Sequence, residues 1–261
     1  MRYAQHPYVT GIIGKFSVDI VPCYRVKSPE KIKSAVDRTP FHVKYLNEKF
    51  FPNMSDEVRL LKQFLKANGI YGADAKTEGF SGYLCDLLIL YYGKFIKVLK
   101  AASKWVPGEI IDIESYWPKN DYPKLRRKFR GEALIVIDPV DRNRNVASAV
   151  SSMNFYRFTK LAQEFLKNPS IKFFFPRKIK PLSEEDFLKI VKHRGTKLLA
   201  VVFKPPNVVP DILWPQLRKT TRRLKDILEE YEFSVHRFCC WTDEKKIAVI
   251  LFEMEVWSLP N

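Results

Sequence analysis

The sequence has few cysteines and no long apolar run. Its four cysteines, Cys23, Cys85, Cys239 and Cys240, form no Cys-x-x-Cys pair and have no histidine at zinc-ligand spacing. This pattern excludes a zinc finger and a disulfide framework, and it favours a reducing compartment. No stretch approaches the roughly 18 uninterrupted apolar residues of a membrane span, and the N-terminus lacks the apolar segment of a signal peptide. We therefore expect a cytoplasmic protein with no membrane partner.

Several familiar catalytic signatures are also absent. The chain contains no Gly-x-x-x-x-Gly-Lys-Ser/Thr loop and no dinucleotide fingerprint, which excludes P-loop NTPases and Rossmann enzymes. It has neither the Gly-x-Ser-x-Gly elbow of serine hydrolases nor the His-Glu-x-x-His of zinc proteases. Internal repeats and low-complexity tracts are missing as well. Phosphoryl or nucleotidyl transfer remains among the enzyme classes.

Positive charge is what the chain has in excess. Lys+Arg number 45 against 29 Asp+Glu, a formal net charge of +16, in a chain that is 46% hydrophobic. The apolar content suffices for a core, and the charge favours a nucleic acid or a phosphorylated ligand over a simple solubility bias. One basic, aromatic stretch, residues 116–130, is predicted to be a loop or lid. Its candidate RNA-binding residues are Lys124, Arg126, Arg127, Lys128 and Arg130.

The first two thirds of the chain indicate a hairpin, several helices and one buried strand. Alternating apolar residues around Gly14-Lys15 predict a tight hairpin over 8–24. Helices are predicted over 29–36, 55–68, 83–100 and 153–167, and the one over 83–100 is apolar enough to be a buried spine. A strand over 133–137 is predicted to end in a turn that begins at Asp138.

Composition changes over residues 169–181, where we expect a domain boundary near Pro176. The last segment has the order helix, strand, helix, strand, strand, over 184–193, 198–204, 212–231, 233–239 and 246–254. Such an order favours a ferredoxin-like or RRM-like open sheet. The sequence as a whole therefore predicts the α+β class.

Four polar residues near the N-terminus are candidate site residues, one for a metal ion and three for a triphosphate. Asp19 interrupts a run of apolar strand residues, where a charge needs a partner. His42, Lys62 and Tyr71 follow, and this mix of imidazole, cation and hydroxyl suits phosphate oxygens. Taken singly, each could instead be a structural side chain, and for His42 and Lys62 that interpretation is the better one.

Five blocks of the sequence carry a family resemblance, both in their residues and in the order in which they follow one another. They are HPYVTGIIGKFSVDIVPCYRV, IKSAVDRTPFH, EVRLLKQFLKANGIYGA, GFSGYLCDLLI and DPVDRNRNVASAVS, with weaker likeness through FFFPRK to the end. Together they closely resemble the archaeal CCA-adding enzymes, the class I tRNA nucleotidyltransferases. The resemblance covers nearly the whole chain.

This resemblance implies a polymerase β-like nucleotidyltransferase. Such an enzyme adds C, C and A to the tRNA 3′ end from CTP and ATP, without a template and with release of pyrophosphate. Residues 1–52 would be the C-terminal part of its palm sheet, and 53–176 a central helical nucleotide-binding domain. Residues 177–261 would be a ferredoxin-like α/β body domain.

The resemblance also assigns roles to individual residues. Asp19 would be the third of three carboxylates that hold two Mg²⁺ ions. His42, Lys62 and Tyr71 would contact ATP or CTP. Arg144 would recognise the edge of the incoming C or A, a task that suits the fixed fork of guanidinium donors. A salt bridge at a helix entry is the structural alternative for Arg144.

The chain departs from the family pattern at both ends. The Gly-Ser turn and the Asp-x-Asp pair that precede the His-Pro-Tyr block in family members are absent, and so is the tail domain. We therefore expect a fragment that is inactive alone, because one carboxylate cannot hold two magnesium ions. The alternatives are a non-catalytic tRNA-binding remnant, one subunit of a split enzyme completed by an N-terminal fragment, or a more distant poly(A) polymerase or oligoadenylate synthetase relative. A homodimer is also compatible with the resemblance.

Overall fold

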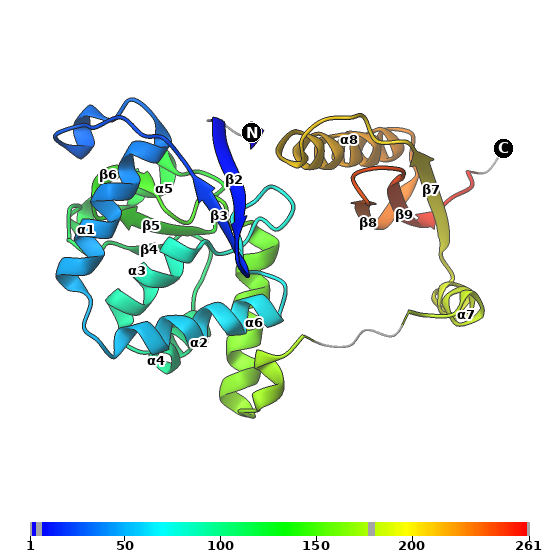
Figure 1. Ribbon diagram of the computed structural model, residues 1–261. Coiled ribbons are helices and arrows are strands. Elements are labelled where there is room, and N and C mark those ends of the chain that lie inside the picture. The colour runs from blue at the N-terminus through cyan, green and yellow to red at the C-terminus, as the bar shows by residue number, and fades with distance from the viewer. Residues whose placement is uncertain (1, 4–6, 177–180, 260–261) are drawn as a thin grey trace. The chain divides into compact units, whose positions relative to one another are not determined.

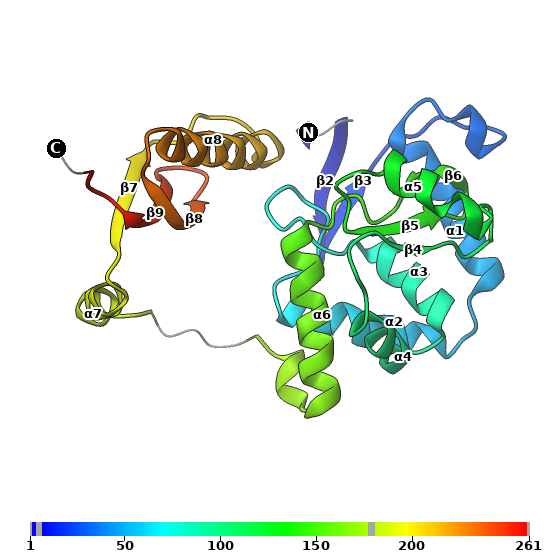
Figure 2. The ribbon, with the colours of Figure 1, turned by 180° about the vertical axis from the view of Figure 1, so that it is seen from behind.

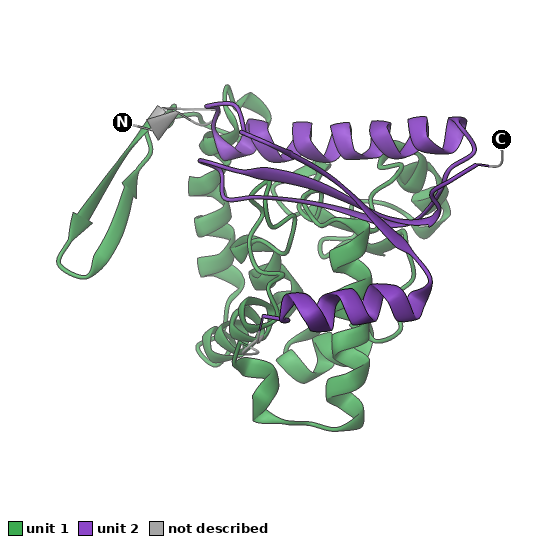
Figure 3. Ribbon diagram, turned by 90° about the vertical axis from the view of Figure 1, so that its right-hand side faces the viewer, with its two compact units in different colours: residues 1–177 green, residues 178–261 purple. Residues whose placement is uncertain are grey.

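The computed structural model describes residues 2–3, 7–176 and 181–259. The chain divides into two compact units, residues 1–177 and 178–261, drawn in green and purple in Figure 3. The expected boundary near Pro176 adjoins residues 177–180, which lie outside the described part of the chain.

Unit 1 begins with an antiparallel hairpin, as predicted. Strand β2 (Pro7–Ile13) pairs with β3 (Phe16–Ile20) across a turn at Gly14, whose φ of +60° suits a glycine, and the short β1 (Arg2–Tyr3) pairs with β2. The hairpin projects from the rest of the unit (Figure 3). Cross-strand pairs share a face. One face therefore carries Val9, Gly11, Ile13, Phe16, Val18 and Ile20. This apolar face is largely exposed, with Phe16 at 73%.

The segment after the hairpin differs from the prediction. The expected helix over 29–36 is replaced by two short 3-10 helices, Pro29–Lys31 and Ala35–Arg38, and these lead into helix α1 (Thr39–Lys49), which the sequence reasoning missed. Pro40 does not mark the end of the helix that was expected over 29–36. It stands instead in the first turn of α1, where its missing N–H has no helical partner to lose.

A buried carboxylate holds this segment in place. Asp37 accepts hydrogen bonds from the backbone N–H groups of Tyr24, Lys33 and Ser34 and from the Ser34 hydroxyl, at 2.8–2.9 Å. Burial alone would raise the pKa of Asp37, but these four donors lower it to about 2. The ionised carboxylate therefore fixes the path of the chain into α1.

Four longer helices build the body of unit 1. They are α2 (Met54–Ala67), α3 (Gly82–Tyr92), α4 (Phe95–Ala102) and α6 (Ser152–Lys167). The predictions for α2 and α6 are confirmed, whereas the single helix predicted over 83–100 is wrong. The chain breaks at Gly93, which adopts a φ of +83°, and a new helix begins at Phe95. Two shorter helices can bury their apolar sides in one core, which a straight spine could not.

A small sheet lies beside these helices (Figures 1 and 2). Strand β4 (Glu109–Ile111) runs parallel to β5 (Leu134–Asp138), which pairs antiparallel with β6 (Asp141–Asn145). Leu134 and Val136 face the helical core, whereas Ile135 and Ile137 pack on the opposite face of β5. The sheet is thus covered on both sides, and Asp138 ends its central strand.

The stretch over 116–130 is more ordered than the predicted loop or lid. It contains a 3-10 helix (Lys119–Asp121) and helix α5 (Tyr122–Lys128). Leu125 of α5 is buried against Ile135 and Ile137 of β5. The basic residues therefore lie on the outer side of a helix that is anchored to the sheet.

Aromatic rings fill the core of unit 1. Phe64 of α2 contacts Phe95 of α4 and Phe158 of α6, with ring centroids 5.5 and 6.4 Å apart. It also stacks on Phe173 of the 3-10 helix Ile171–Phe174 at 6.0 Å. These contacts fix α2 against its neighbours, so side chains on the outer surface of α2 are held in position.

Unit 2 is a three-stranded sheet with helices. Its elements are α7 (Glu184–Arg194), β7 (Lys197–Phe203), α8 (Pro210–Glu230), β8 (Ser234–Thr242) and β9 (Ala248–Val256). The strand order is β7-β9-β8, all antiparallel, and Leu217 of α8 packs on Ile250, Phe252 and Met254 of β9. The predicted α+β class is confirmed. No helix of the described residues is long and apolar enough to cross a membrane.

Candidate functional site

The main polar centre of unit 1 is built around the carboxylate at the end of β5. The Asp138 side chain is fully buried. Its Oδ2 lies 3.0 Å from His42 Nε2 of α1 and accepts a hydrogen bond of 2.8 Å from Arg144 Nη1 of β6. Its Oδ1 accepts from the Val140 N–H at 3.1 Å and from the Tyr83 hydroxyl at 3.5 Å. Four donors from separate parts of the chain therefore converge on one carboxylate.

The chemistry of this carboxylate follows from its neighbours. Burial by itself would raise the pKa of Asp138, but the His42, Val140 and Arg144 donors outweigh burial and lower it below its usual value. A carboxylate only accepts hydrogen bonds, so His42 carries a proton on Nε2. The His42 ring also stacks on the Tyr83 ring, with centroids 3.9 Å apart. The position of the imidazole is thus fixed by a hydrogen bond and a stack.

A second polar group lies on the same end of α3. Lys62 of α2 donates to Asp86 at 2.9 Å. A Cβ placed on Gly82 would lie 3.3 Å from the Tyr71 hydroxyl and 3.7 Å from Lys62 Nζ, so Tyr71 and Lys62 meet over this glycine. Burial raises the pKa of Asp86, and the Lys62 ammonium acts against that rise. An ammonium and a hydroxyl over a bare glycine leave room for a phosphate oxygen to approach both.

The loop after β4 holds the β5–β6 turn in place. The Tyr116 hydroxyl donates to the Pro139 carbonyl at 2.6 Å, and Trp117 Nε1 donates to the Arg142 carbonyl at 3.1 Å. The buried Asp112 accepts from the Trp117 N–H at 2.8 Å. These bonds restrain the backbone that carries Arg144.

The structure brings four of the five predicted site residues into two groups. His42 and Arg144 share Asp138, and Lys62 and Tyr71 meet at Gly82. Sequence reasoning missed Asp138, Tyr83 and Asp86. A carboxylate that directly follows an apolar strand, as Asp138 follows residues 134–137, is a signal that could have identified the first of them.

Asp19 is not brought to either group. It is exposed on β3 and accepts a hydrogen bond of 2.7 Å from Thr10, its cross-strand partner. Among the described residues no group of three or more His, Cys, Asp or Glu side chains could hold a metal ion. These residues alone therefore do not fit a pair of magnesium ions.

The five basic candidates for RNA binding differ in how they are held. Lys124 pairs with Asp121 at 2.6 Å, and Lys128 donates to Asn143 Oδ1 at 2.8 Å. Arg126 Nε donates to the Gly108 carbonyl at 3.0 Å. Arg127 and Arg130 are exposed and make no ion pair within the described part of the chain.

Two family models match the chain and define its class. Residues 56–175 match the second domain of tRNA nucleotidyltransferases, a range that holds Lys62, Tyr71, Asp138 and Arg144. Residues 194–261 match the C-terminal domain of the CCA-adding enzyme. These two matches place the chain among the tRNA nucleotidyltransferases.

Curated relatives specify the family. The chain is 44% identical over 260 residues to the CCA-adding enzyme of Methanosarcina mazei, covering all of this chain and 55% of that protein. It is 45% identical over 256 residues to the CCA-adding enzyme of Archaeoglobus fulgidus, with coverages of 98% and 56%. For that of Methanocaldococcus jannaschii the identity is 44% over 266 residues, with coverages of 100% and 57%. The chain belongs to the archaeal CCA-adding enzyme family and spans just over half the length of these relatives.

Proposed function

We propose that this chain is the nucleotide-selecting and RNA-holding part of a CCA-adding tRNA nucleotidyltransferase. The convergence of His42 and Arg144 on the buried Asp138, next to the Lys62–Tyr71 pair, is the observation that carries the proposal. Its ligands are CTP and ATP, and its RNA partner is a tRNA 3′ end in the cytoplasm. Residues 1–52, 53–176 and 177–261 would act as palm, central and body domains.

Each group has a separate task in this proposal. Lys62 supplies a positive charge and Tyr71 a hydroxyl for the triphosphate. Arg144 presents its guanidinium to the base, and Asp138 holds that guanidinium in one orientation. Cytosine and adenine present acceptors that a fixed fork of donors can satisfy, whereas uracil and guanine arrange theirs differently. Lys124, Arg126, Arg127, Lys128 and Arg130 would contact RNA phosphates.

Asp19 would supply one carboxylate to a magnesium site. Magnesium is a hard cation that prefers carboxylate oxygens, and in nucleotidyl transfer it neutralises the departing pyrophosphate. The remaining ligands would come from a complementing N-terminal fragment, because among the described residues Asp19 belongs to no group of three or more His, Cys, Asp or Glu side chains that could hold a metal ion. A complementing N-terminal fragment could also cover the apolar hairpin face, which is exposed here.

The test has two parts. Calorimetric titration of the chain with CTP, ATP, UTP and GTP should show binding of CTP and ATP and weaker binding of the other two. Incorporation of CTP and ATP into a tRNA that lacks CCA should then require an added N-terminal fragment with the missing carboxylates. Equal affinity for all four nucleotides would contradict the assignment of Arg144. Incorporation by the chain alone would contradict the need for a second piece.

A tRNA-binding remnant without catalysis is the second candidate. Two observations favour it: the exposed Asp19 belongs to no group of three or more metal-ligating side chains among the described residues, and the net charge is +16. It predicts that tRNA binds while no fragment restores incorporation. A homodimer remains a further proposal, which sedimentation equilibrium can check.

A further inference from the structure

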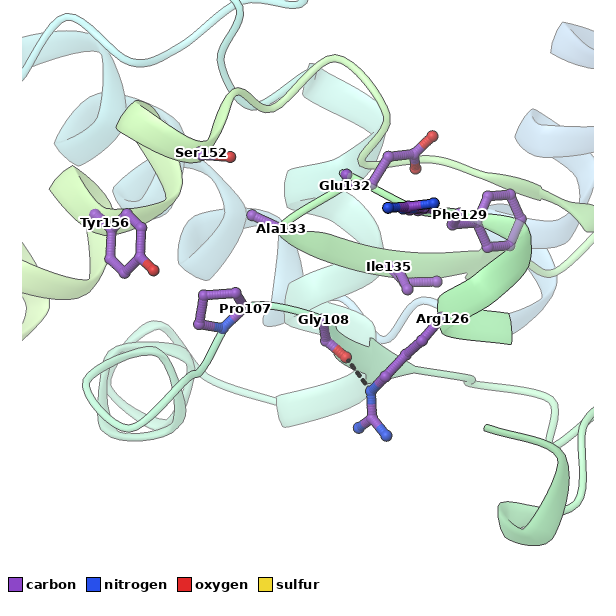
Figure 4. Close-up of a pocket in the computed structure, with 11 residues that line it drawn as sticks. Pro107, Gly108, Arg126, Phe129, Glu132, Ala133, Ile135, Ser152 and Tyr156 are labelled. Atoms are coloured by element: carbon purple, nitrogen blue, oxygen red, sulfur yellow. Dashed lines mark hydrogen bonds between the residues drawn. The ribbon is translucent and has the colours of Figure 1, made fainter. Parts of the chain in front are cut away.

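A pocket lies at the opposite end of β5 from Asp138. It encloses about 320 Å³ and is lined by residues 107–108, 126, 129–133 and 135 and by Ser152 and Tyr156 of α6 (Figure 4). Ala133 and Ile135 belong to its floor, and Asp138 lies five residues beyond Ala133. At about 3.3 Å per strand residue, Asp138 is roughly 10 Å from Ile135 and roughly 17 Å from Ala133 along the strand. The pocket is therefore distinct from the nucleotide site.

One side of the pocket presents a preorganised guanidinium. Arg126 Nε is held by the Gly108 carbonyl at 3.0 Å, and Figure 4 shows the end of the guanidinium directed away from the strand. Gly108 adopts a φ of +82°, and a Cβ there would lie 3.4 Å from Arg126 Nε, so the glycine provides both the acceptor and the space. The two terminal amino groups of Arg126 make no hydrogen bond within the described part of the chain. Such a fork matches the two oxygens of a phosphate.

The other side presents an exposed aromatic ring. Tyr156 is 55% exposed, and it lies across the pocket from Arg126 in Figure 4. Phe155 supports it in an edge contact, with ring centroids 5.5 Å apart. An aromatic face with one open side is a stacking platform for a nucleobase.

The charges around the pocket favour an anion. Arg126 and Arg130 both line it, against one lining carboxylate, Glu132, which is hydrogen-bonded to the Asn145 amide. The Arg126 charge also acts on Glu109 of β4, so Arg126 is partly balanced, whereas Arg130 has no ion pair within the described residues. The pocket volume is in the range of ligand sites, close to its lower limit.

We propose that this pocket binds one nucleotide unit of an RNA strand, with its phosphate on Arg126 and Arg130 and its base on Tyr156. The inference rests on the proposed function, since a strand whose 3′ end reaches Arg144 has to extend several nucleotides to arrive here. RNA is favoured over a free nucleotide because only a polymer can occupy both sites at once.

Anisotropy of a labelled tRNA acceptor-stem hairpin that lacks CCA tests this on the full chain. Arg126→Gln and Tyr156→Ala should each weaken RNA binding about tenfold, since an arginine–phosphate contact or one stacked base is worth this much. Arg126→Gln should also lower the salt dependence of log K by about 0.7–0.9. Neither variant should change CTP affinity. Arg157→Gln is the matched control, because it removes the same charge from the helix that carries Tyr156 without lining the pocket.

The outcomes separate the inference from the function. If wild type binds RNA and Arg126→Gln weakens it no more than Arg157→Gln, the pocket assignment is overturned. Loss of CTP affinity in Tyr156→Ala, with an unchanged unfolding midpoint, would overturn it too. A wild-type chain that binds no RNA contradicts the proposed function and this inference together.

Discussion

Replacement of Asp138 by asparagine should separate the two roles of this carboxylate, in stability and in nucleotide selection. All four neighbours of its oxygens, from His42, Arg144, Val140 and Tyr83, are donors. An asparagine amide would place an NH₂ group against donors in either orientation, so no flip satisfies the site. The substitution keeps the shape of the side chain, removes its charge and replaces one acceptor by a donor.

The magnitude follows from burial. Asp138 is 0% exposed, and loss of one partner in a fully buried pair costs about 3–5 kcal/mol. Arg144 is 36% exposed, so water can replace part of its lost bond. We therefore expect Asp138→Asn to lower the free energy of unfolding by about 2 kcal/mol. CTP affinity should fall about tenfold, because the released guanidinium has to be ordered again on binding.

Urea unfolding followed by circular dichroism, together with CTP titration, measures both effects. Asp141→Asn is the matched control on the same turn. Its ion pair with Arg38 is partly exposed at 3.2 Å, so its cost should stay below about 1 kcal/mol. Equal stability losses in the two variants would refute the reasoning from burial. Unchanged discrimination of CTP from UTP in Asp138→Asn would refute the positioning of Arg144.

The pH dependence of stability gives an independent check on the contribution of Asp138. The pKa of folded Asp138 is lowered, so its contribution is present above the unfolded value of about 3.9 and is lost as the pH falls from there. The stability difference between wild type and Asp138→Asn should therefore be full at pH 6 and shrink below pH 4. A difference that grows on acidification would contradict the sign of the pKa shift.

Three further changes have defined outcomes. Gly82→Ala should leave the free energy of unfolding within about 1 kcal/mol of wild type, since alanine suits a helix. It should reduce CTP and ATP affinity severalfold in calorimetry, because its methyl group meets Tyr71 and Lys62. Unchanged affinity would contradict the triphosphate assignment. The hydrogen bonds of Asp37, whose pKa is about 2, should be retained at pH 5 and lost between about pH 4 and 2. Their loss should be visible as faster proteolysis of the segment before α1. Protection from proteolysis that persists in Asp37→Ala would argue against this role. Phe16→Lys should raise solubility without lowering the melting temperature, because the ring is 73% exposed. It should also weaken any complementation by an N-terminal fragment. A lower melting temperature would show that the hairpin face is packed within the chain.

Local sequence patterns determine many of the helices and strands. The Gly14 turn, the period-2 alternation of the hairpin and the amphipathic pattern of α2 each act within a few residues, so the sequence alone predicts them. The same reasoning missed helix α1, which begins beside Pro40, and the break between α3 and α4 at Gly93. Proline and glycine are each compatible with either a helix end or a helix start. Only packing of α1, α3 and α4 against their neighbours selects between these.

The residue types of the site were in the sequence, but their grouping was not. Residue types suggested His42, Lys62 and Tyr71 as triphosphate ligands. Only the family resemblance assigned roles to them and to Arg144, since none of these residues forms a local motif. Asp138 joins His42 and Arg144 across 96 and 6 residues of chain, and Lys62 reaches Asp86 across 24. Such pairings depend on where β5 ends and how α1 and α3 pack against it. The sequence by itself therefore determined the family, the charge and the local elements. Only the tertiary structure decided that one buried carboxylate orients two functional side chains, because only folding removes that carboxylate from water.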